Sequence, residues 1–358
     1  MTKKITITNS SQNWNAKKRY KINEIVTHNG IDYQNTTGAN SEPGVGSDWV
    51  VLDLIGGIVG TQYYYVAGNG TPTQNATELQ TAYDLAKTIS GLSATNRFKI
   101  IVGTGKYEFT GQFLINTQYI DFVSLTNDAD VEFTNGISVT ANNVFLKGLK
   151  TSLPFQIATN LNLLICDTCI GGNESFGGNI NITVSGTFNN CVAGTQSFGG
   201  SSATSSGIFN NCVAGGGSFS LAGGATGIFN NCVAGSSSFG STASGTFNNC
   251  VAGTQSLGSG TASGTFNNCV ATTQSFGGIT ASGTFTNCVA GGSSFGSSTA
   301  SGTFTNCIGG NQSFGSFGGG VLTGKLFYCR LTTGTFQTVS GAGRTYYCVD
   351  GNGNPNNQ

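Results

Sequence analysis

Thiols are the reactive side chains with the most regular spacing in this sequence of 358 residues. The chain has 11 cysteines, and Cys166 and Cys169 form a Cys-x-x-Cys pair. A redox pair of this kind is expected in a βαβ context, and a zinc site requires a second pair. Neither pattern accompanies Cys166, so we predict that it is a core residue. Cys169 also begins a regular series, which comprises Cys169, Cys191, Cys212, Cys232, Cys250, Cys269, Cys288, Cys307, Cys329 and Cys348.

Carboxylates are the second group that could do chemistry. Hydrolysis of a polysaccharide requires two carboxyl groups that flank the scissile bond, but no charged residue occurs between Glu174 and Lys325. The remaining candidates are Asp121, Asp128, Asp130, Glu132, Asp167 and Glu174. Asp128, Asp130 and Glu132 alternate along a predicted strand, a pattern that would suit an acid or metal site. Because strand alternation alone produces this pattern, we predict exposed decoration.

The single histidine and the zero net charge exclude several further classes of function. His28 is the only histidine, in a Thr-His-Asn-Gly segment typical of a hairpin turn, so neither a Ser-His-Asp triad nor a His-rich metal site is expected. The 15 basic and 15 acidic residues give zero net charge, without the basic footprint of nucleic-acid binding. No apolar run is long enough to span a membrane, and the first residues lack the apolar region of a secretory leader. No cofactor is predicted.

Alignment of the chain on its cysteines reveals an internal repeat. Phe lies three positions before most of these cysteines, Asn directly before them and Val or Ile directly after them. Length varies only in the Gly/Ser/Thr/Ala segments between these units. Seven positions after each of the first nine ladder cysteines is a large apolar residue, in the series Phe176, Phe198, Phe219, Phe239, Leu257, Phe276, Phe295, Phe314 and Phe336.

This repeat predicts a parallel β-solenoid of short strands joined by bends. Apolar residues do not recur at helical spacing, and the leucine-rich-repeat frame is absent. Successive turns would lie about 4.8 Å apart, so the repeated Cys and Phe residues would stack into ladders over roughly 50 Å. Stacked thiols point in the same direction, which favours free buried thiols over disulfides. Paired Asn residues suit the bends, because Asn tolerates the left-handed conformation and stacked amides bond to one another.

The segment before the repeats is predicted to begin the solenoid. Residues 75–89 are predicted to form an amphipathic helix with Asn75 or Thr77 as N-cap and with an apolar face of Leu79, Ala82, Leu85, Ala86 and Ile89. Short strands are predicted at 98–102, 120–125, 131–133, 137–139 and 144–146. A helix commonly covers the unpaired end of a solenoid, so we predict a capping role.

The helix and the following Ile-Val-Gly-Thr-Gly-Lys-Tyr segment, residues 101–107, resemble the opening of pectate-lyase-like β-helices. The resemblance covers about 63–350 and is greatest to the versions carried by bacteriophage tail fibres and spikes. It implies an all-β fold, a right-handed parallel β-helix with a short N-terminal capping helix, preceded by a small β-rich module. We divide the chain into a module at 1–52, a linker at 53–62, the helix and first coils at 63–165, the Cys/Phe repeats at 166–350 and a tail at 351–358.

The first fifty residues resemble a carbohydrate-binding module of the chitinase type. The matching residues are Trp14, Tyr20, Val26, Gly30, Tyr33, Pro43 and Trp49. In that family an exposed aromatic pair after the second Tyr stacks on sugar, but here the place holds Asn35-Thr36-Thr37. Trp14, Tyr20, Tyr33 and Trp49 are therefore predicted to form the core of a three-stranded module, with glycan contact as the alternative.

These observations predict a non-enzymatic, structural and adhesive component of a virion appendage. Such shafts are usually homotrimers, and the expected partners are other virion proteins and host-surface polysaccharide. The first alternative is a tail-spike depolymerase with a carboxylate site between subunits. The second is an ice-binding solenoid, which the lack of a regular Thr-x-Thr row and of an export signal disfavours.

Overall fold

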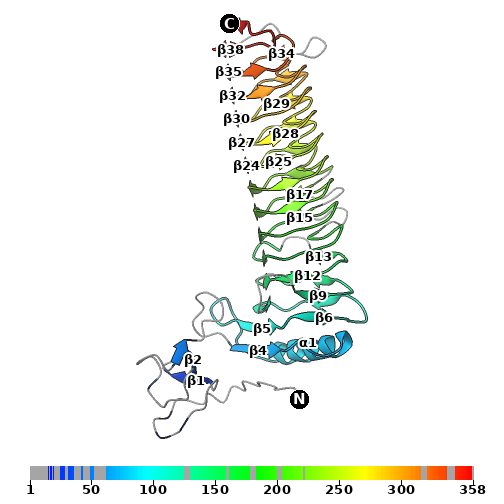
Figure 1. Ribbon diagram of the computed structural model, residues 1–358, viewed down its shortest axis with the longest axis vertical. Coiled ribbons are helices and arrows are strands. Elements are labelled where there is room, and N and C mark those ends of the chain that lie inside the picture. Colours follow the sequence, from blue (N-terminus) through cyan, green and yellow to red (C-terminus); the bar gives the residue numbers. More distant parts are fainter. Residues whose placement is uncertain are drawn as a thin grey trace.

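The computed structural model is almost entirely β-structure and forms a parallel β-solenoid of about 11 turns (Figure 1). This confirms the predicted fold class. The structure describes residues 62–124, 130–158, 161–177, 183–199, 204–220, 222–315, 321–336 and 343–356, together with 25–28, 31–35, 49–51 and the single residues 15, 17, 19 and 42.

One 14-stranded parallel sheet runs the length of the solenoid. Its strands pair in register, so equivalent residues of successive turns lie directly above one another; Phe229, for example, pairs with Phe247, and Phe247 with Phe266. Its members are β4 (Gln62–Val66), β5 (Phe98–Val102), β8 (Ile120–Ser124), β11 (Phe145–Lys147), β14 (Ile165–Asp167), β16 (Thr187–Asn189), β18 (Ile208–Asn210), β21 (Ile228–Asn230), β24 (Thr246–Asn248), β27 (Thr265–Asn267), β30 (Thr284–Thr286), β32 (Thr303–Thr305), β35 (Lys325–Phe327) and β37 (Arg344–Tyr346).

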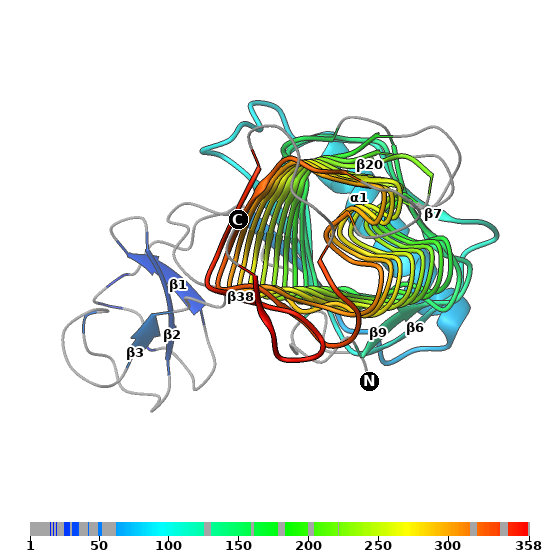
Figure 2. The same cartoon turned by 90° about the horizontal axis from the view of Figure 1, so that it is seen from above.

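Shorter sheets form the other sides, and the turns superpose when the solenoid is seen from above (Figure 2). Directly after the cysteines come β19 (Val213–Ala214), β22 (Val233–Ala234), β25 (Val251–Ala252) and β28 (Val270–Ala271), then β33 (Ile308–Gly309), β36 (Arg330–Leu331), β38 (Cys348–Val349) and the antiparallel β39 (Pro355–Asn356). An eight-stranded sheet contains β15 (Thr183–Val184), β17 (Thr204–Ser205), β20 (Gly224–Ala225), β23 (Thr242–Ala243), β26 (Thr261–Ala262), β29 (Thr280–Ala281), β31 (Thr299–Ala300) and β34 (Val321–Leu322). The first turns add two three-stranded sheets, β6 (Gly105–Tyr107), β9 (Val131–Phe133) and β12 (Leu149–Lys150), and β7 (Phe113–Ile115), β10 (Ile137–Val139) and β13 (Phe155–Ile157).

Helix α1 (Pro72–Lys87) covers the first turn, opposite the C-terminal end of the rod (Figure 1). It buries Leu79, Ala82 and Ala86 as predicted and packs against β4, β5 and β6. The predicted N-cap was wrong. The helix begins earlier, because Thr71 accepts a hydrogen bond from the Gln74 amide in a capping box, and Pro72 fits the first helical position.

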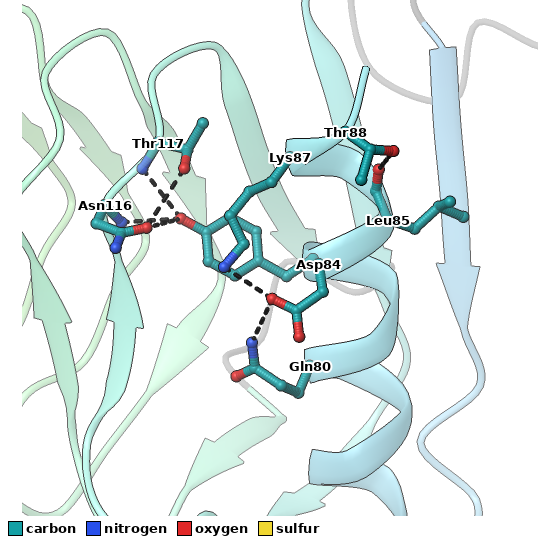
Figure 3. A network of polar contacts seen from close by, with 8 residues as sticks. Gln80, Asp84, Leu85, Lys87, Thr88, Asn116 and Thr117 are labelled. Carbon is teal, nitrogen blue, oxygen red and sulfur yellow. Dashed lines mark hydrogen bonds and ion pairs between the residues drawn. The ribbon is translucent and has the colours of Figure 1, made fainter.

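Asn75 lies inside this helix, where its side-chain amide donates to the carbonyl oxygens of Gly68 and Lys106 at 3.0 and 2.9 Å. Tyr83 is buried on the same face, and its hydroxyl accepts hydrogen bonds from the backbone amides of Asn116 and Thr117 (Figure 3). On the outer side, Lys87 pairs with Asp84 at 2.7 Å and lowers the pKa of that carboxyl. The helix is thereby fixed to the strands that it covers.

The interior consists of two phenylalanine ladders set edge to face. Within each ladder the rings stack in parallel, as for Phe229 on Phe247 with centroids 4.9 Å apart. Between the ladders the rings are perpendicular, as for Phe229 and Phe239 at 5.3 Å and 86°. Both arrangements are favourable for the quadrupoles of the rings. Phe198, Phe219, Phe239, Phe276, Phe295 and Phe314 are all completely buried, which confirms the predicted ladder.

Before seven of the ten ladder cysteines the bend is made by the Asn that directly precedes the cysteine, in five of them the second Asn of a pair. Asn249, for instance, has φ of 53°, and its amide donates to the Asn231 side chain at 3.1 Å. The first Asn forms a separate amide ladder, in which Asn248 donates to Asn230 at 2.8 Å. The left-handed bend and the stacked amides were both predicted, and both are confirmed.

A glycine lies at the corner directly before each long-sheet strand of the repeats, and it allows successive turns to approach closely there. A Cβ on Gly264 would lie 2.2 Å from the carbonyl oxygen of Gly245 in the preceding turn. Because that oxygen belongs to the backbone, Gly264→Ala should lower the free energy of unfolding by about 1–3 kcal/mol. Gly111, whose Cβ would meet nothing within 4 Å, provides the matched control. Chemical denaturation should show a change of at most about 0.5 kcal/mol for Gly111→Ala. Equal effects of the two changes would contradict the close approach.

Candidate functional site

The cysteines occupy one completely interior column. Each of the ten ladder cysteines is at most 1% exposed, and all 11 are free thiols, as predicted. Cys250 Sγ donates to the carbonyl oxygens of Phe229 at 3.3 Å and Asn248 at 3.5 Å, and the same pattern recurs in the neighbouring turns. Burial raises the pKa of Cys191 and raises that of Cys329 to about 12. These inaccessible thiols are suited to packing rather than to nucleophilic or redox chemistry.

Cys166 lies where the next turns have phenylalanine. It pairs with Phe188 in the long sheet and is completely buried, which confirms its predicted core position. Burial raises the pKa of its thiol. The Cys-x-x-Cys spacing therefore follows from two interior positions of one turn.

A ladder of buried serines was missed in the sequence. Each lies directly before the large apolar residue that comes seven positions after a cysteine. Its backbone amide donates to the hydroxyl of the next serine, as Ser256 does to Ser275 at 3.4 Å and Ser275 to Ser294 at 3.2 Å. The following Phe adopts a left-handed conformation, with φ of 52° at Phe276. The recurrence of Ser-Phe-Gly was visible, but left-handed backbone is expected for Gly or Asn rather than Phe. Leu257 has the same conformation, with φ of 52°, so the buried position in the turn rather than an aromatic ring requires it.

Asp121 forms a structural ion pair with Arg97 and is not placed as a catalytic acid. It is 1% exposed, and Arg97 donates from Nε to its Oδ2 at 2.8 Å. The backbone amide of Phe145 donates to its other oxygen at 2.9 Å. This pairing raises the pKa of Arg97. Asp121 therefore connects three successive turns.

Asp121→Ala should destabilise the first turns by about 3–5 kcal/mol, because it leaves the Arg97 charge without its partner in a mostly buried site. Asp167→Asn is the control, since Asp167 lies 3.9 Å from Lys147 and both side chains are 22% exposed. The control should change stability by less than about 1 kcal/mol. Thermal unfolding followed by circular dichroism measures both. A loss in the control as large as in Asp121→Ala would reject this assignment.

The other candidate carboxylates do not lie together in one site. Asp130 is exposed and precedes β9, while Glu132 lies within β9 and pairs with Lys106 at 3.4 Å. Asp167 contacts Lys147 and accepts from the Asn190 amide, and Glu174 is exposed in a bend. Asp128 lies outside the described residues. Among the residues that the structure describes, no three His, Cys, Asp or Glu side chains are arranged to hold a metal ion.

The N-terminal module contains a three-stranded antiparallel sheet of β1 (Ile25–His28), β2 (Ile31–Asn35) and β3 (Trp49–Val51). His28 pairs with Ile31 across the predicted hairpin. Tyr33 lies in β2 and Trp49 in β3, whereas Trp14 and Tyr20 lie outside the described residues. The choice between core and glycan contact for these four aromatics stays a prediction.

The outer surface of the shaft consists of uncharged columns. On the long sheet, a column of threonines that includes Thr265 lies beside the amide ladder, and around the corner the residues after the cysteines form a valine column. These valines are between 38% and 46% exposed: Val192, Val213, Val233, Val251, Val270 and Val289. A continuous exposed apolar column of this length is typical of a protein interface.

The columns change chemistry in the last two turns of the long sheet. Lys325 and Arg344 continue the threonine column, and Phe327 and Tyr346 follow Thr305. At the corner, where earlier turns have Asn, Tyr328 and Tyr347 stack at 5.2 Å. Sequence reasoning missed this cluster, although the return of charge at Lys325 was a visible signal.

No protein-family model, curated protein or solved structure was found to match this chain significantly. In the part of the chain that the structure describes, no helix has the length and apolar character needed to cross a membrane.

Proposed function

We propose that this chain is a non-enzymatic, structural and adhesive component of a virion appendage, of the tail-fibre or tail-spike type. The observation that carries the proposal is the continuous stack of Phe, Cys and Ser ladders, in which equivalent residues keep one register from turn to turn. A solenoid with inter-turn hydrogen bonds in every turn resists bending, as an attachment shaft requires. Assignment to a virion rests on the resemblance of the helix and the first coils to phage fibres.

The chemistry of the shaft favours this function over a depolymerase. Asp121, Glu132 and Asp167 each contact a cation, and the surface between Glu174 and Lys325 has no carboxylate. A glycosidase needs two carboxyl groups flanking one bond. Sugar release from host capsule that is abolished by Asp130→Asn would favour the depolymerase instead.

The valine column supports the homotrimeric assembly. Three copies that meet along this column would each remove a continuous apolar row from water. Val233→Lys combined with Val251→Lys should convert trimers to monomers in mass photometry. Thr246→Lys combined with Thr265→Lys introduces the same charges on the adjacent face and should leave trimers intact. Dissociation of both variants, or a monomeric wild type, would reject this interface.

The virion assignment is tested by immunogold electron microscopy of particles with antibodies against the purified chain. Label on fibres or spikes is expected, and purified protein should appear as straight rods in negative stain. Label confined to host cells would contradict the assignment.

One observation favours ice binding as a second candidate. Thr-x-Thr occurs in the consecutive strands β30 and β32, and Thr265 and Thr246 continue one of these rows. Regular hydroxyl rows are the surface that an ice-binding solenoid needs. Measurable thermal hysteresis that is lost in Thr284→Tyr would favour this function.

A further inference from the structure

The cluster at the C-terminal end of the long sheet differs from every turn below it. It consists of Lys325, Phe327, Tyr328, Arg344, Tyr346 and Tyr347, in strands β35 and β37 and at the corners that follow them. We call these six residues the end patch. In Figure 1 this part of the rod lies beside the label for the C-terminus, at the end opposite α1.

The aromatic residues of the end patch face outward. Tyr328, Tyr346 and Tyr347 are 58%, 41% and 68% exposed, so they are not needed to fill the interior. Phe327 stacks on Tyr346 with centroids 5.0 Å apart. In the turns below, Asn and Thr at the same positions are sufficient for the fold. Exposed, mutually ordered aromatic rings are typical of binding surfaces, where they contribute contact area at a low cost in conformational entropy.

The cations of the end patch repel one another. Lys325 and Arg344 pair directly across adjacent strands, an arrangement that is unfavourable for like charges. Neither forms an ion pair within the described residues, and Arg330 on the adjoining side adds a third exposed cation. The nearest acid in sequence, Asp350, accepts hydrogen bonds from the amides of Asn352 and Asn354, which lower its pKa. A bound anion would relieve the repulsion between the two cations.

We infer that the end patch binds an acidic polysaccharide whose sugar rings bear carboxylates. The cation column and the aromatic column lie two residues apart on one strand face, roughly 7 Å, and successive turns are about 4.8 Å apart. These dimensions match one sugar ring against the aromatic column with its carboxylate beside Lys325 or Arg344. The C–H groups of a sugar are attracted to the negative face of an aromatic ring. The inference gives the adhesive part of the proposed function a location and a ligand class.

Affinity electrophoresis of the purified full chain tests this inference, with alginate as the acidic probe and dextran as the neutral one. Wild type should be retarded by alginate but not by dextran, and the retardation should fall as salt rises, because salt screens exposed charges. Lys325→Gln with Arg344→Gln should weaken alginate binding at least about tenfold, as should Tyr346→Ser with Tyr347→Ser. Thr265→Gln with Thr284→Gln places the same amides lower in the same column and should change binding by less than about twofold.

Several outcomes would overturn the inference: no retardation by alginate, equal retardation by dextran, or end-patch variants that bind as wild type does while their unfolding is unchanged. Tighter binding of oligothymidylate than of alginate would also overturn it, because aromatic and basic surfaces bind single-stranded nucleic acid too. The result is separable from the appendage assignment. Immunogold label on fibres without alginate binding rejects only the end patch, and alginate binding without label on particles rejects only the virion assignment.

Discussion

Cys250→Asp is expected to abolish the folded shaft around the substituted turn. Cys250 is completely buried, and its thiol donates to the carbonyl oxygens of Phe229 and Asn248. A carboxylate at this position would face those two oxygens without a cation, and an uncompensated buried charge costs about 3–5 kcal/mol. In a solenoid each turn contacts only its neighbours, so the break would separate the turns on either side. Limited proteolysis should then cleave near residue 250, where wild type resists.

The control variants are Cys250→Val and Cys250→Ala. Val keeps an apolar side chain of similar size, and Ala leaves a small cavity, so each should cost no more than about 1–2 kcal/mol. Both should give soluble rods with one cooperative transition in circular dichroism. A soluble, protease-resistant Cys250→Asp protein would show that the thiol column tolerates charge, contrary to its complete burial.

The second large effect is expected at alkaline pH. Burial raises the pKa of Cys166, Cys191 and Cys329 above that of a thiol in the unfolded chain, about 8.5. Above that pH the unfolded chain loses protons that the folded chain keeps, so stability falls as pH rises. Each such thiol contributes fully below about pH 8.5 and loses about 1.4 kcal/mol per pH unit above it, until the folded pKa is reached. For Cys329 the loss continues to about pH 12.

Together these three thiols should lower the free energy of unfolding by about 3 kcal/mol between pH 8.5 and 9.5, because the slope reaches its full value only above the unfolded pKa. Urea denaturation at several pH values measures this slope. A variant with Cys191→Val and Cys329→Val should lose about two thirds of it, while a variant with Thr265→Val, on the outer surface, should keep it. A midpoint that does not change between pH 8 and 10 would contradict the neutral, buried state of the thiols.

The interior of the repeats could be predicted because a solenoid converts sequence periodicity into spatial stacking. Cys166 was correctly predicted to be a core residue, and it lies in the column of Phe188, while the Asn bend was predicted before seven of the ten ladder cysteines. These conclusions require only that equivalent residues of successive turns lie above one another. The first turns were less predictable, because they do not repeat. There Thr71 rather than Asn75 caps the helix, and Leu85, expected on its apolar face, is 52% exposed while Tyr83 is buried.

Contacts between residues far apart in the chain could also not be predicted from the sequence. The pairing of Arg97 with Asp121 crosses 24 positions and depends on the length of the first turn, which no repeat defines. The left-handed conformation at Phe276 opposes the usual preference of that residue, and Leu257 shares it at the equivalent position of the preceding turn.

The sequence alone determined which residues share a column, because the spacing of Cys, Phe and Asn defines the register of the turns. Outside the Cys and Phe columns, which were predicted to be interior, only the tertiary structure decided which columns face water. The direction of a side chain depends on how the chain turns at each corner, and one residue more or less at a bend exchanges inside and outside. For this reason the exposed valines and the end patch, on which the proposed assembly and ligand depend, emerged only from the folded chain.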